Sequence, residues 1–303
     1  MIITRCPLRI SLVGGSSDLQ SFLDKHDWGS VVSFPSNLYT YITLKKHADS
    51  YKIVYSSTEL VSHPSDIKND IAREVLSHFS VGPVEITFNT DISSGGSGLA
   101  SSSSYMIALI YAVNEYLHLQ LSRFDICKLA VELERKFNPL TGYQDSYGCG
   151  IGGFKQMIFD KHGNVDFRFL SSDVLRKHAF YLIPTNKYRS STSVLSTINI
   201  DHVLKLRGLS EHMVNHLDSD SAFNQTIRYS WELKKQTSPN ILPAELQILE
   251  KELSENADVS SIKLLGAGGG GYFLLICPVP KPYIEQLGVR IFPDDEGVKI
   301  CYG

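Results

Sequence analysis

The sequence predicts a mixed α+β protein built from two domains, and three observations support this class. Residues 2–13 and 30–45 combine apolar and β-branched residues in the manner of strands. Residues 65–79 carry apolar residues at helical spacing. After about residue 165 short strands alternate with polar helices, so the expected pattern of secondary structure changes there. We therefore expect an N-terminal domain over 1–165 and a C-terminal domain over 166–303.

The first half contains the clearest helices. Besides the two long strands, strands are expected near residue 53 and at 84–90. The helix over 65–79 would have Ser65 or Asp66 as its cap. A second helix follows a glycine- and serine-rich segment, and a third begins at the capping box "SRFD" and runs from Ser122 to Phe137.

The second half alternates short strands with polar helices. The expected strands are "FYLIP", "SIKLL" and "YFLLIC". The expected helices include "AFNQTIRYSWELKKQ" and "PAELQILEKELSEN".

Composition narrows the functional classes. The net charge is −3 and the isoelectric point is about 6.4, so there is no basic excess for a nucleic-acid backbone or an anionic membrane. No apolar run is long enough for a bilayer, and the first residues lack a secretory-signal layout. Five scattered cysteines without a CxxC pair suit a reduced compartment. We expect a cytoplasmic protein that acts on a small molecule, with its oligomeric state left open.

The chain contains three glycine-rich segments. They are "LVGGSSD" near Gly14, "SSGGSGLASSSS" near Gly95 and "LLGAGGGGYF" near Gly268. Any one of them is more often a tight turn, because glycine adopts backbone conformations that other residues avoid. All three together favour close approach of the backbone to a ligand.

The second segment runs directly into an apolar helix. A helix start leaves about four backbone N–H groups unpaired and carries partial positive charge. The serines from Ser101 to Ser104 can cap the helix or offer hydroxyls to a phosphate or its metal, so the segment predicts a phosphate-binding loop. It is not a Walker A loop, because that motif requires a lysine.

The third segment contains a GxGxxG pattern from Gly266 to Gly271. A dinucleotide-binding fingerprint requires strand, loop and helix, whereas here a strand is expected on each side. A glycine flap of a protein kinase would need HRD, DFG and VAIK partners, which the sequence lacks.

Asp145 is the strongest candidate acid. We expect it in a glycine-flanked loop after the third helix, within "NPLTGYQDSYGCGIGGF". A loop carboxylate is usually a solvated turn former, but Tyr143, Gln144 and Tyr147 beside it could line a sugar-sized pocket.

Helical geometry separates two glutamates of the third helix. At about 100° per residue, Glu134 falls at the edge of the apolar stripe, while Glu132 falls on the solvated face. Glu134 could therefore reach a site at the end of the core. A glutamate and a serine hydroxyl are the hard oxygen ligands that Mg²⁺ accepts.

The first glycine-rich segment carries a base and an acid. Arg9 lies on the strand that leads into Gly14 and Gly15, and Asp18 follows them. These two charges form a surface ion pair or supply charge to an active site.

The three segments, in this order, resemble the motifs of the galactokinase, homoserine kinase, mevalonate kinase and phosphomevalonate kinase (GHMP) family. The matching stretches are "PLRISLVGGSSDL", "GGSGLASSS" and "KLLGAGGGG". Within this family, "LERKF" and "GYQDSYGCGIGGF" are most similar to the D-glycero-D-manno-heptose 7-phosphate kinases, with the L-fucose kinases next. The resemblance implies a two-domain fold, with ATP and Mg²⁺ bound between the domains.

The resemblance also implies roles for individual residues. Asp145 matches the acid beside the acceptor hydroxyl, Arg9 the basic residue of the first motif, and Ser102 and Glu134 the metal ligands. Asp18 matches an acid that binds sugar hydroxyls. The expected ATP-binding residues are Ser94, Gly95, Gly96, Ser97, Gly98, Leu99, Ala100, Ser101, Ser102 and Ser103. The expected acceptor-binding residues are Asp18, Gly14, Gly15, Tyr143, Gln144, Arg189, Gly268 and Gly269.

The implied reaction is ATP-dependent phosphorylation of the anomeric hydroxyl of a sugar phosphate. Arg189, within "PTNKYRSSTSVL", offers a planar fork of donors for the acceptor's own phosphate, or else belongs to a solvated loop. The first motif has a shorter glycine run than the heptose kinases usually have. Ser146 stands after Asp145 where those kinases usually have a glutamine. The alternatives are a kinase for a free sugar such as L-fucose, and a catalytically silent sugar-sensing regulator of the same fold.

Overall fold

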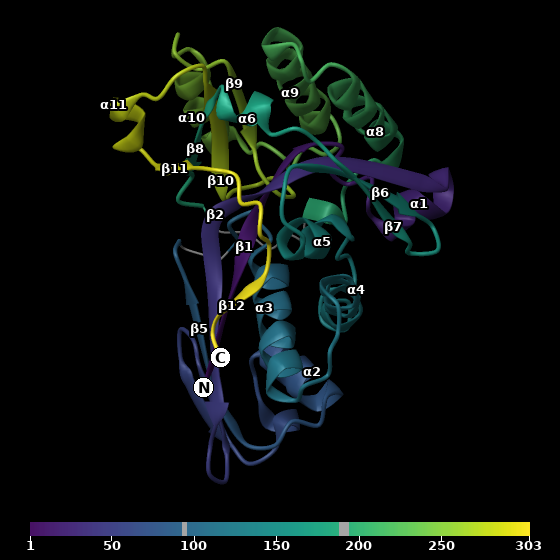
Figure 1. Cartoon of the computed structure of the whole chain (residues 1–303). Helices are drawn as coiled ribbons and strands as arrows, with labels where there is room; N and C mark the ends of the chain where they lie inside the picture. Colours follow the sequence, from purple (N-terminus) through teal and green to yellow (C-terminus); the bar gives the residue numbers. More distant parts are fainter. Residues whose placement is uncertain (93–95, 188–193) are drawn as a thin grey trace.

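Two β-sheets organise the chain, as a computed structural model shows. The structure describes residues 1–92, 96–187 and 194–303. Within these ranges, one sheet has eight strands and the other has four. Helices pack on both sheets, so the predicted mixed α+β class is confirmed (Figure 1).

The larger sheet is centred on two long antiparallel strands, β1 (Ile2–Val13) and β2 (Trp28–Lys46). Its order is β12-β1-β2-β5-β3-β4, and β6 pairs with β2 and carries β7. The remaining strands are β3 (Tyr51–Val54), β4 (Thr58–Val61), β5 (Val84–Thr90), β6 (Lys155–Asp160), β7 (Val165–Phe169) and β12 (Lys299–Tyr302). The bounds predicted for β1 and β5 are confirmed.

Helices α3 (Ser101–Tyr116), α4 (Arg123–Glu134) and α5 (Gln144–Gly150) cover this sheet. Helix α3 packs on β1 and β2 and is itself packed against α4 and α5. The predicted capping box of the third helix is confirmed, because the Ser122 side chain accepts a bond from the Asp125 amide and the Asp125 carboxylate accepts one from Ser122.

Two predictions about helices were wrong. The first helix begins at Asp70 rather than Ser65, giving α2 (Asp70–His78) with Asn69 as its cap. The residues before it form a short 3₁₀ turn, η1 (Pro64–Asp66), and the Glu59 carboxylate holds the backbone N–H groups that follow that turn. Asp145 lies in the first turn of α5 and not in a loop, and the short helix α1 (Gln20–His26) was not predicted.

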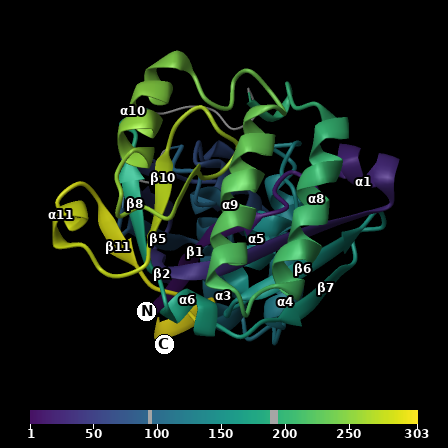
Figure 2. The same ribbon diagram turned by 90° about the horizontal axis from the view of Figure 1, so that it is seen from above.

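The smaller sheet has the order β11-β8-β10-β9. Its strands are β8 (Ala179–Pro184), β9 (Ser261–Leu264), β10 (Tyr272–Cys277) and β11 (Val289–Ile291). The helices around it are α6 (Asp173–Arg176), α8 (Ile200–Asn215), α9 (Asp220–Lys235), α10 (Ala244–Ser254) and α11 (Pro282–Glu285). Helices α9 and α10 pack on β9, and α8 lies beside α9 (Figure 2). No helix in the described ranges is long and apolar enough to cross a membrane.

The chain crosses between the two sheets twice. It leaves the larger sheet after β7 and returns in β12, where Ile3 pairs with Tyr302. The two ends of the chain are therefore neighbours (Figure 1). The larger sheet takes strands from both sides of the predicted division at 165/166.

Two glycine-rich segments touch through their backbones. A Cβ atom on Gly98 would lie 2.6 Å from the carbonyl oxygen of Leu265, and one on Gly266 would lie 2.4 Å from the Cα of Gly98. A Cβ on Gly271 would lie 2.4 Å from the carbonyl oxygen of Ser97. Only glycine allows this approach, which joins the loop before α3 to the β9–β10 loop.

We expect Gly266→Ala to destabilise the protein. Gly266 has a φ of +70° and no room for a Cβ, so strain and overpacking should together lower the free energy of unfolding by about 2 kcal/mol or more. Urea unfolding measures this. The control is Gly82→Ala, where a Cβ would meet no atom within 4 Å and the change should stay within about 0.5 kcal/mol. Equal effects of the two substitutions would contradict the backbone contact.

Candidate active site

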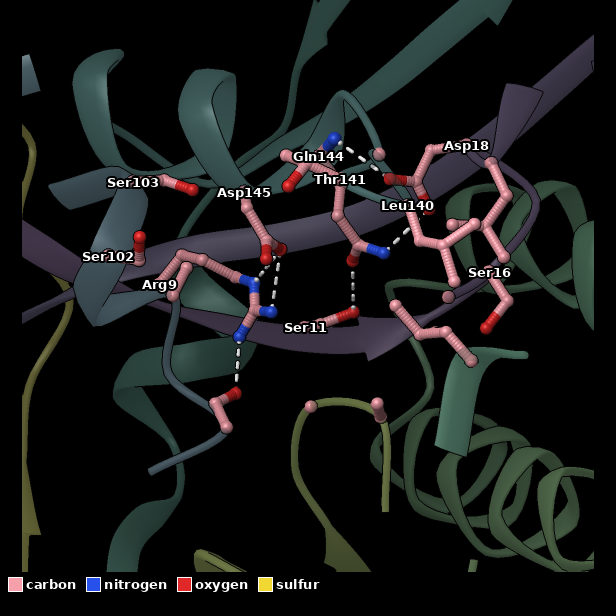
Figure 3. A pocket seen from close by; sticks show the side chains of 18 of the residues that line it. Arg9, Ser11, Ser16, Asp18, Ser102, Ser103, Leu140, Thr141, Gln144 and Asp145 are labelled. Atoms are coloured by element: carbon pink, nitrogen blue, oxygen red, sulfur yellow. Dashed lines mark hydrogen bonds and ion pairs between the residues drawn. The ribbon is translucent and has the colours of Figure 1, made fainter. Parts of the chain in front are cut away.

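A cavity of about 300 Å³ brings the three glycine-rich segments together. The first segment contributes Gly15, the second contributes Gly96 and Gly98, and the third contributes Gly266. Polar side chains of β1, α3, α4 and α5 line the same cavity (Figure 3). Residues separated by more than 250 positions thus meet at one site.

The loop before α3 is shaped to receive an anion. Ala100 adopts the left-handed conformation with a φ of 63°, and the first backbone bond of the helix runs from the Ser104 N–H to the Ala100 carbonyl. Among the described residues, the N–H groups of the first turn before Ser104 form no backbone bond and can point at a ligand. The Ser97 hydroxyl accepts a bond from the Leu99 N–H and lies 2.9 Å from the Ser101 hydroxyl, which fixes the loop.

Most of the predicted ATP-binding residues line the cavity. These are Gly96, Ser97, Gly98, Ala100, Ser101, Ser102 and Ser103. Leu99 is fully buried in the core beneath the loop, so its side chain does not face the cavity. Ser94 and Gly95 lie outside the described residues.

Arg9, which is buried, and Asp145, which is half-buried, form an ion pair beside this loop. Both Nε and Nη2 of Arg9 donate to Oδ1 of Asp145, at 3.0 and 2.6 Å. The third bond of the guanidinium goes from Nη1 to the carbonyl oxygen of Gly98, at 2.6 Å. Arg9 therefore ties the acid of α5 to the backbone of the anion-binding loop (Figure 3). The alternative of a surface ion pair with Asp18 is wrong, because Arg9 is 4% exposed and pairs with Asp145.

Gln144 connects Asp18 to β1. The Gln144 side chain donates to Oδ1 of Asp18 at 2.6 Å, and its backbone N–H donates to Oδ2 at 3.0 Å. The Ser11 hydroxyl donates to Oε1 of Gln144 at 3.0 Å. Burial, followed by repulsion from Asp145, raises the pKa of Asp18 to about 6. This polar row lines the part of the cavity beyond the ion pair (Figure 3).

Glu134 reaches the cavity as the helical geometry predicts. It is 2% exposed and accepts a bond from the Ser103 hydroxyl at 2.6 Å, whereas Glu132 is exposed. Burial raises the pKa of Glu134 to about 7, although bonds from Ser103 and Ser102 favour the charged form.

The oxygen donors around Glu134 suit a magnesium ion. The described ranges hold no cluster of three or more His, Cys, Asp or Glu side chains, so protein ligands alone do not enclose a metal. Mg²⁺ commonly takes one or two protein oxygens and fills its other positions with phosphate oxygens and water. A buried carboxylate with no cationic partner among the described residues, beside the hydroxyls of Ser102 and Ser103, fits this pattern.

Four residues predicted to bind the acceptor do not line the cavity. The Tyr143 ring is buried against Phe159, and its hydroxyl donates to Gln20. Gly14 and Gly268 are packed against backbone, because a Cβ would lie 2.0 Å from the carbonyl oxygen of Ser30 and 2.8 Å from the Cα of Ile241, respectively. The Gly269 N–H donates to the Ile241 carbonyl. Arg189 lies outside the described residues.

The second half of the chain supplies cavity residues that were not predicted. Ser230 and Lys234 come from α9, and Lys263 comes from β9. Lys263 is the charged residue of the strand "SIKL", and a lysine between the apolar residues Ile262 and Leu264 was the signal in the sequence that could have identified it.

Known proteins resemble this chain over several residues of the site. The model of the GHMP kinases N terminal domain matches residues 66–153, which include the anion-binding loop, Glu134 and Asp145. The chain is 27% identical to the D-glycero-alpha-D-manno-heptose 7-phosphate kinase of Campylobacter jejuni, over 93% of this chain and 91% of that protein. It is 25% identical to the L-fucokinase/L-fucose-1-P guanylyltransferase of Bacteroides fragilis, over 70% of this chain but 24% of that protein.

A solved structure agrees over the whole length. The crystal structure of a D-glycero-D-manno-heptose 1-phosphate kinase from Bacteroides thetaiotaomicron superposes with a TM-score of 0.78 at 21% identity, covering 100% of this chain and 99% of that one. The match to the family model over 66–153, the full-length sequence similarity and the shared fold relate this chain to the GHMP kinases, which are ATP-dependent phosphotransferases.

We expect Glu134→Gln to raise the KM for MgATP and lower kcat, because it removes the buried carboxylate that a metal ion would contact. Glu132→Gln makes the same chemical change two residues away on the exposed face and should leave both constants near wild type. Steady-state kinetics at varied Mg²⁺ measures the difference. Similar kinetics for the two variants would remove Glu134 from the site.

We expect the contribution of Asp18 to stability to fall with rising pH. Its pKa of about 6 in the folded protein exceeds the usual 3.8 of an aspartate, so the folded state holds the proton more tightly. The free energy of unfolding, relative to that of Asp18→Asn, should therefore decrease by about 2–3 kcal/mol between pH 4 and pH 7. Urea unfolding of both proteins across this range measures it. A difference independent of pH would show that Asp18 ionises as freely as in water.

Proposed function

We propose that this protein is an ATP-dependent sugar kinase that phosphorylates the anomeric hydroxyl of D-glycero-D-manno-heptose 7-phosphate to give the 1,7-bisphosphate. The observation that carries the proposal is the Arg9–Asp145 pair, which places a carboxylate beside the anion-binding loop in one cavity. The loop would hold the phosphates of ATP, and the polar row of Ser11, Gln144 and Asp18 would hold the sugar.

Asp145 has a free oxygen for the acceptor. Arg9 engages Oδ1 alone, and Oδ2 has no partner among the described residues. The acceptor hydroxyl would donate to Oδ2 and pass its proton there as its oxygen bonds to the γ-phosphorus. The bond from that phosphorus to the bridging oxygen breaks, and ADP leaves with the electron pair. Proton transfer of this kind contributes typically ~10²–10⁴-fold to the rate.

Arg9 would hold Asp145 in place rather than take part in the reaction. Its bonds to Asp145 and to the Gly98 carbonyl fix the distance between the acid and the phosphate loop, and phosphoryl transfer depends mainly on such positioning and on charge neutralisation. Ser102 and Glu134 would hold Mg²⁺, which supplies neutralisation of phosphate charge when it is bound.

The sugar side of the cavity supports a polyol acceptor. The carboxylate of Asp18 and the amide of Gln144 have both accepting and donating groups, as sugar hydroxyls require. The heptose assignment is supported by the relative from Campylobacter jejuni, which matches almost the full length of this chain. The relative from Bacteroides fragilis supports L-fucose as the second candidate acceptor.

A catalytically silent sugar sensor is the alternative outside the enzyme class. Such a protein has no need for an ion-paired acid beside a phosphate loop, yet Arg9, Ser102, Glu134 and Asp145 all line the cavity. Their joint placement favours the kinase.

We expect the wild-type protein to release ADP with the heptose 7-phosphate at a kcat/KM at least tenfold above that with the free heptose or with L-fucose. An ADP-coupled assay of matched sugars and sugar phosphates measures this, with Asp145→Asn as the matched variant. The asparagine should lower kcat at least 100-fold and leave ATP binding intact, because it cannot take the proton. Preference for free L-fucose would replace the heptose assignment, and near-normal turnover by Asp145→Asn would remove Asp145 from the mechanism.

A further inference from the structure

Lys263 is a buried lysine in the wall of the cavity. It lies in the middle of β9 and is 5% exposed. Its Nζ donates to the carbonyl oxygen of Ser11 at 2.9 Å and to that of Leu12. An ammonium has three donors, and these two carbonyls are its partners among the described residues. One donor of Lys263 is therefore left for a ligand.

Among the described residues, no acid compensates the charge of Lys263. Arg9 is paired with Asp145, whereas Lys263 forms no ion pair within the described ranges. Burial lowers the pKa of Lys263 well below its usual value, and the nearby cations Lys234 and Arg9 lower it further. A buried cation without an opposite charge is costly, so the fold maintains an unfavourable charge at this position.

Lys234 adds positive charge to the same wall. It is 9% exposed, lines the cavity, and its Nζ donates to the carbonyl oxygen of Gly266. Gly266 in turn contacts Gly98 of the anion-binding loop. The two lysines thus come from different elements, α9 and β9, and line the same cavity as the acids of the N-terminal half.

We propose that Lys263 is a phosphoryl-binding residue of this cavity, with Lys234 contributing to its positive potential. The remaining donor of Lys263 would bind an anionic phosphoryl oxygen, and the negative charge would offset the cost of the buried ammonium. The proposal deepens the proposed kinase function and rests on it for the source of the phosphoryl group.

Two sources could supply that oxygen, the phosphate of the acceptor or the group in transfer from ATP. Lys263 contacts Ser11, whose hydroxyl belongs to the polar row of the sugar side. Lys234 contacts Gly266, which adjoins the anion-binding loop. The experiment therefore needs an arm for each source.

The first test is the kinetics of Lys263→Gln. The amide can still donate to the carbonyls of Ser11 and Leu12, so the variant removes the charge with limited loss of hydrogen bonding. The matched control is Lys155→Gln, because Lys155 is equally buried and donates to the carbonyls of Gly148, Ile151 and Gly153, but does not line the cavity. Circular dichroism and thermal unfolding establish that each variant folds, and Lys263→Met is the second variant.

We expect Lys263→Gln to lower kcat/KM with the heptose 7-phosphate by about 10- to 100-fold, the usual effect of losing a hydrogen bond to a charged group. A rise in the KM for the sugar phosphate alone, with the free sugar unaffected, assigns the acceptor's phosphate as the ligand. An equal fall with phosphorylated and free sugars, or a rise in the KM for ATP, assigns the group in transfer. Lys155→Gln should leave the KM values near wild type.

The second test does not depend on the acceptor being identified. Binding of inorganic phosphate is followed by ³¹P line broadening, with and without a non-hydrolysable ATP analogue and Mg²⁺. Wild type and Lys155→Gln should bind phosphate, and Lys263→Gln should bind it at least tenfold more weakly. If the wild type rejects heptose 7-phosphate but phosphate binding still depends on Lys263, the acceptor assignment fails and the subsite remains. If Lys263→Gln matches Lys155→Gln in both kinetics and phosphate binding, or if the wild type binds no phosphate, the subsite is refuted.

Discussion

The site depends on the contact between the backbones at Gly98 and Gly266. These two residues approach so closely that neither can carry a side chain, and the contact joins the loop before α3 to the β9–β10 loop. Arg9 then attaches Asp145 to the same point through the Gly98 carbonyl. Asp145, the loop before α3 and the two cavity lysines, Lys234 and Lys263, are therefore arranged around one backbone contact. A shift of either loop would move all of them.

Local sequence rules predicted the structure correctly where the helix or strand that contains a residue also sets its environment. The 3.6-residue period separated buried Glu134 from exposed Glu132, and the capping box at Ser122 marked the start of α4. The same rules failed where a distant segment decides. The start of α2 is fixed by the Glu59 carboxylate, which binds backbone N–H groups nine and ten positions later. Asn69, not Ser65, consequently caps that helix.

The candidate site shows the same division. Arg9, Asp145 and the loop before α3 carry motifs that a sequence comparison recognises, and the structure brings them together. Tyr143 was expected in the pocket because it lies close to Asp145 in the sequence, but neighbouring residues at a helix start point in different directions, and its ring packs on Phe159. Lys263 could not be assigned, because its partners on β1 lie about 250 positions away in the chain. Only the fold places those residues together.

The double crossing of the chain limits how the two halves can move. The segment that forms the smaller sheet is inserted between β7 and β12, so two covalent strands of backbone join the halves instead of one. A single linker permits swivelling about its own axis, whereas two separated attachments permit bending about the line between them. The double attachment therefore excludes free rotation of one half about a single linker, so the residues that the two halves contribute to the cavity keep their relative orientation.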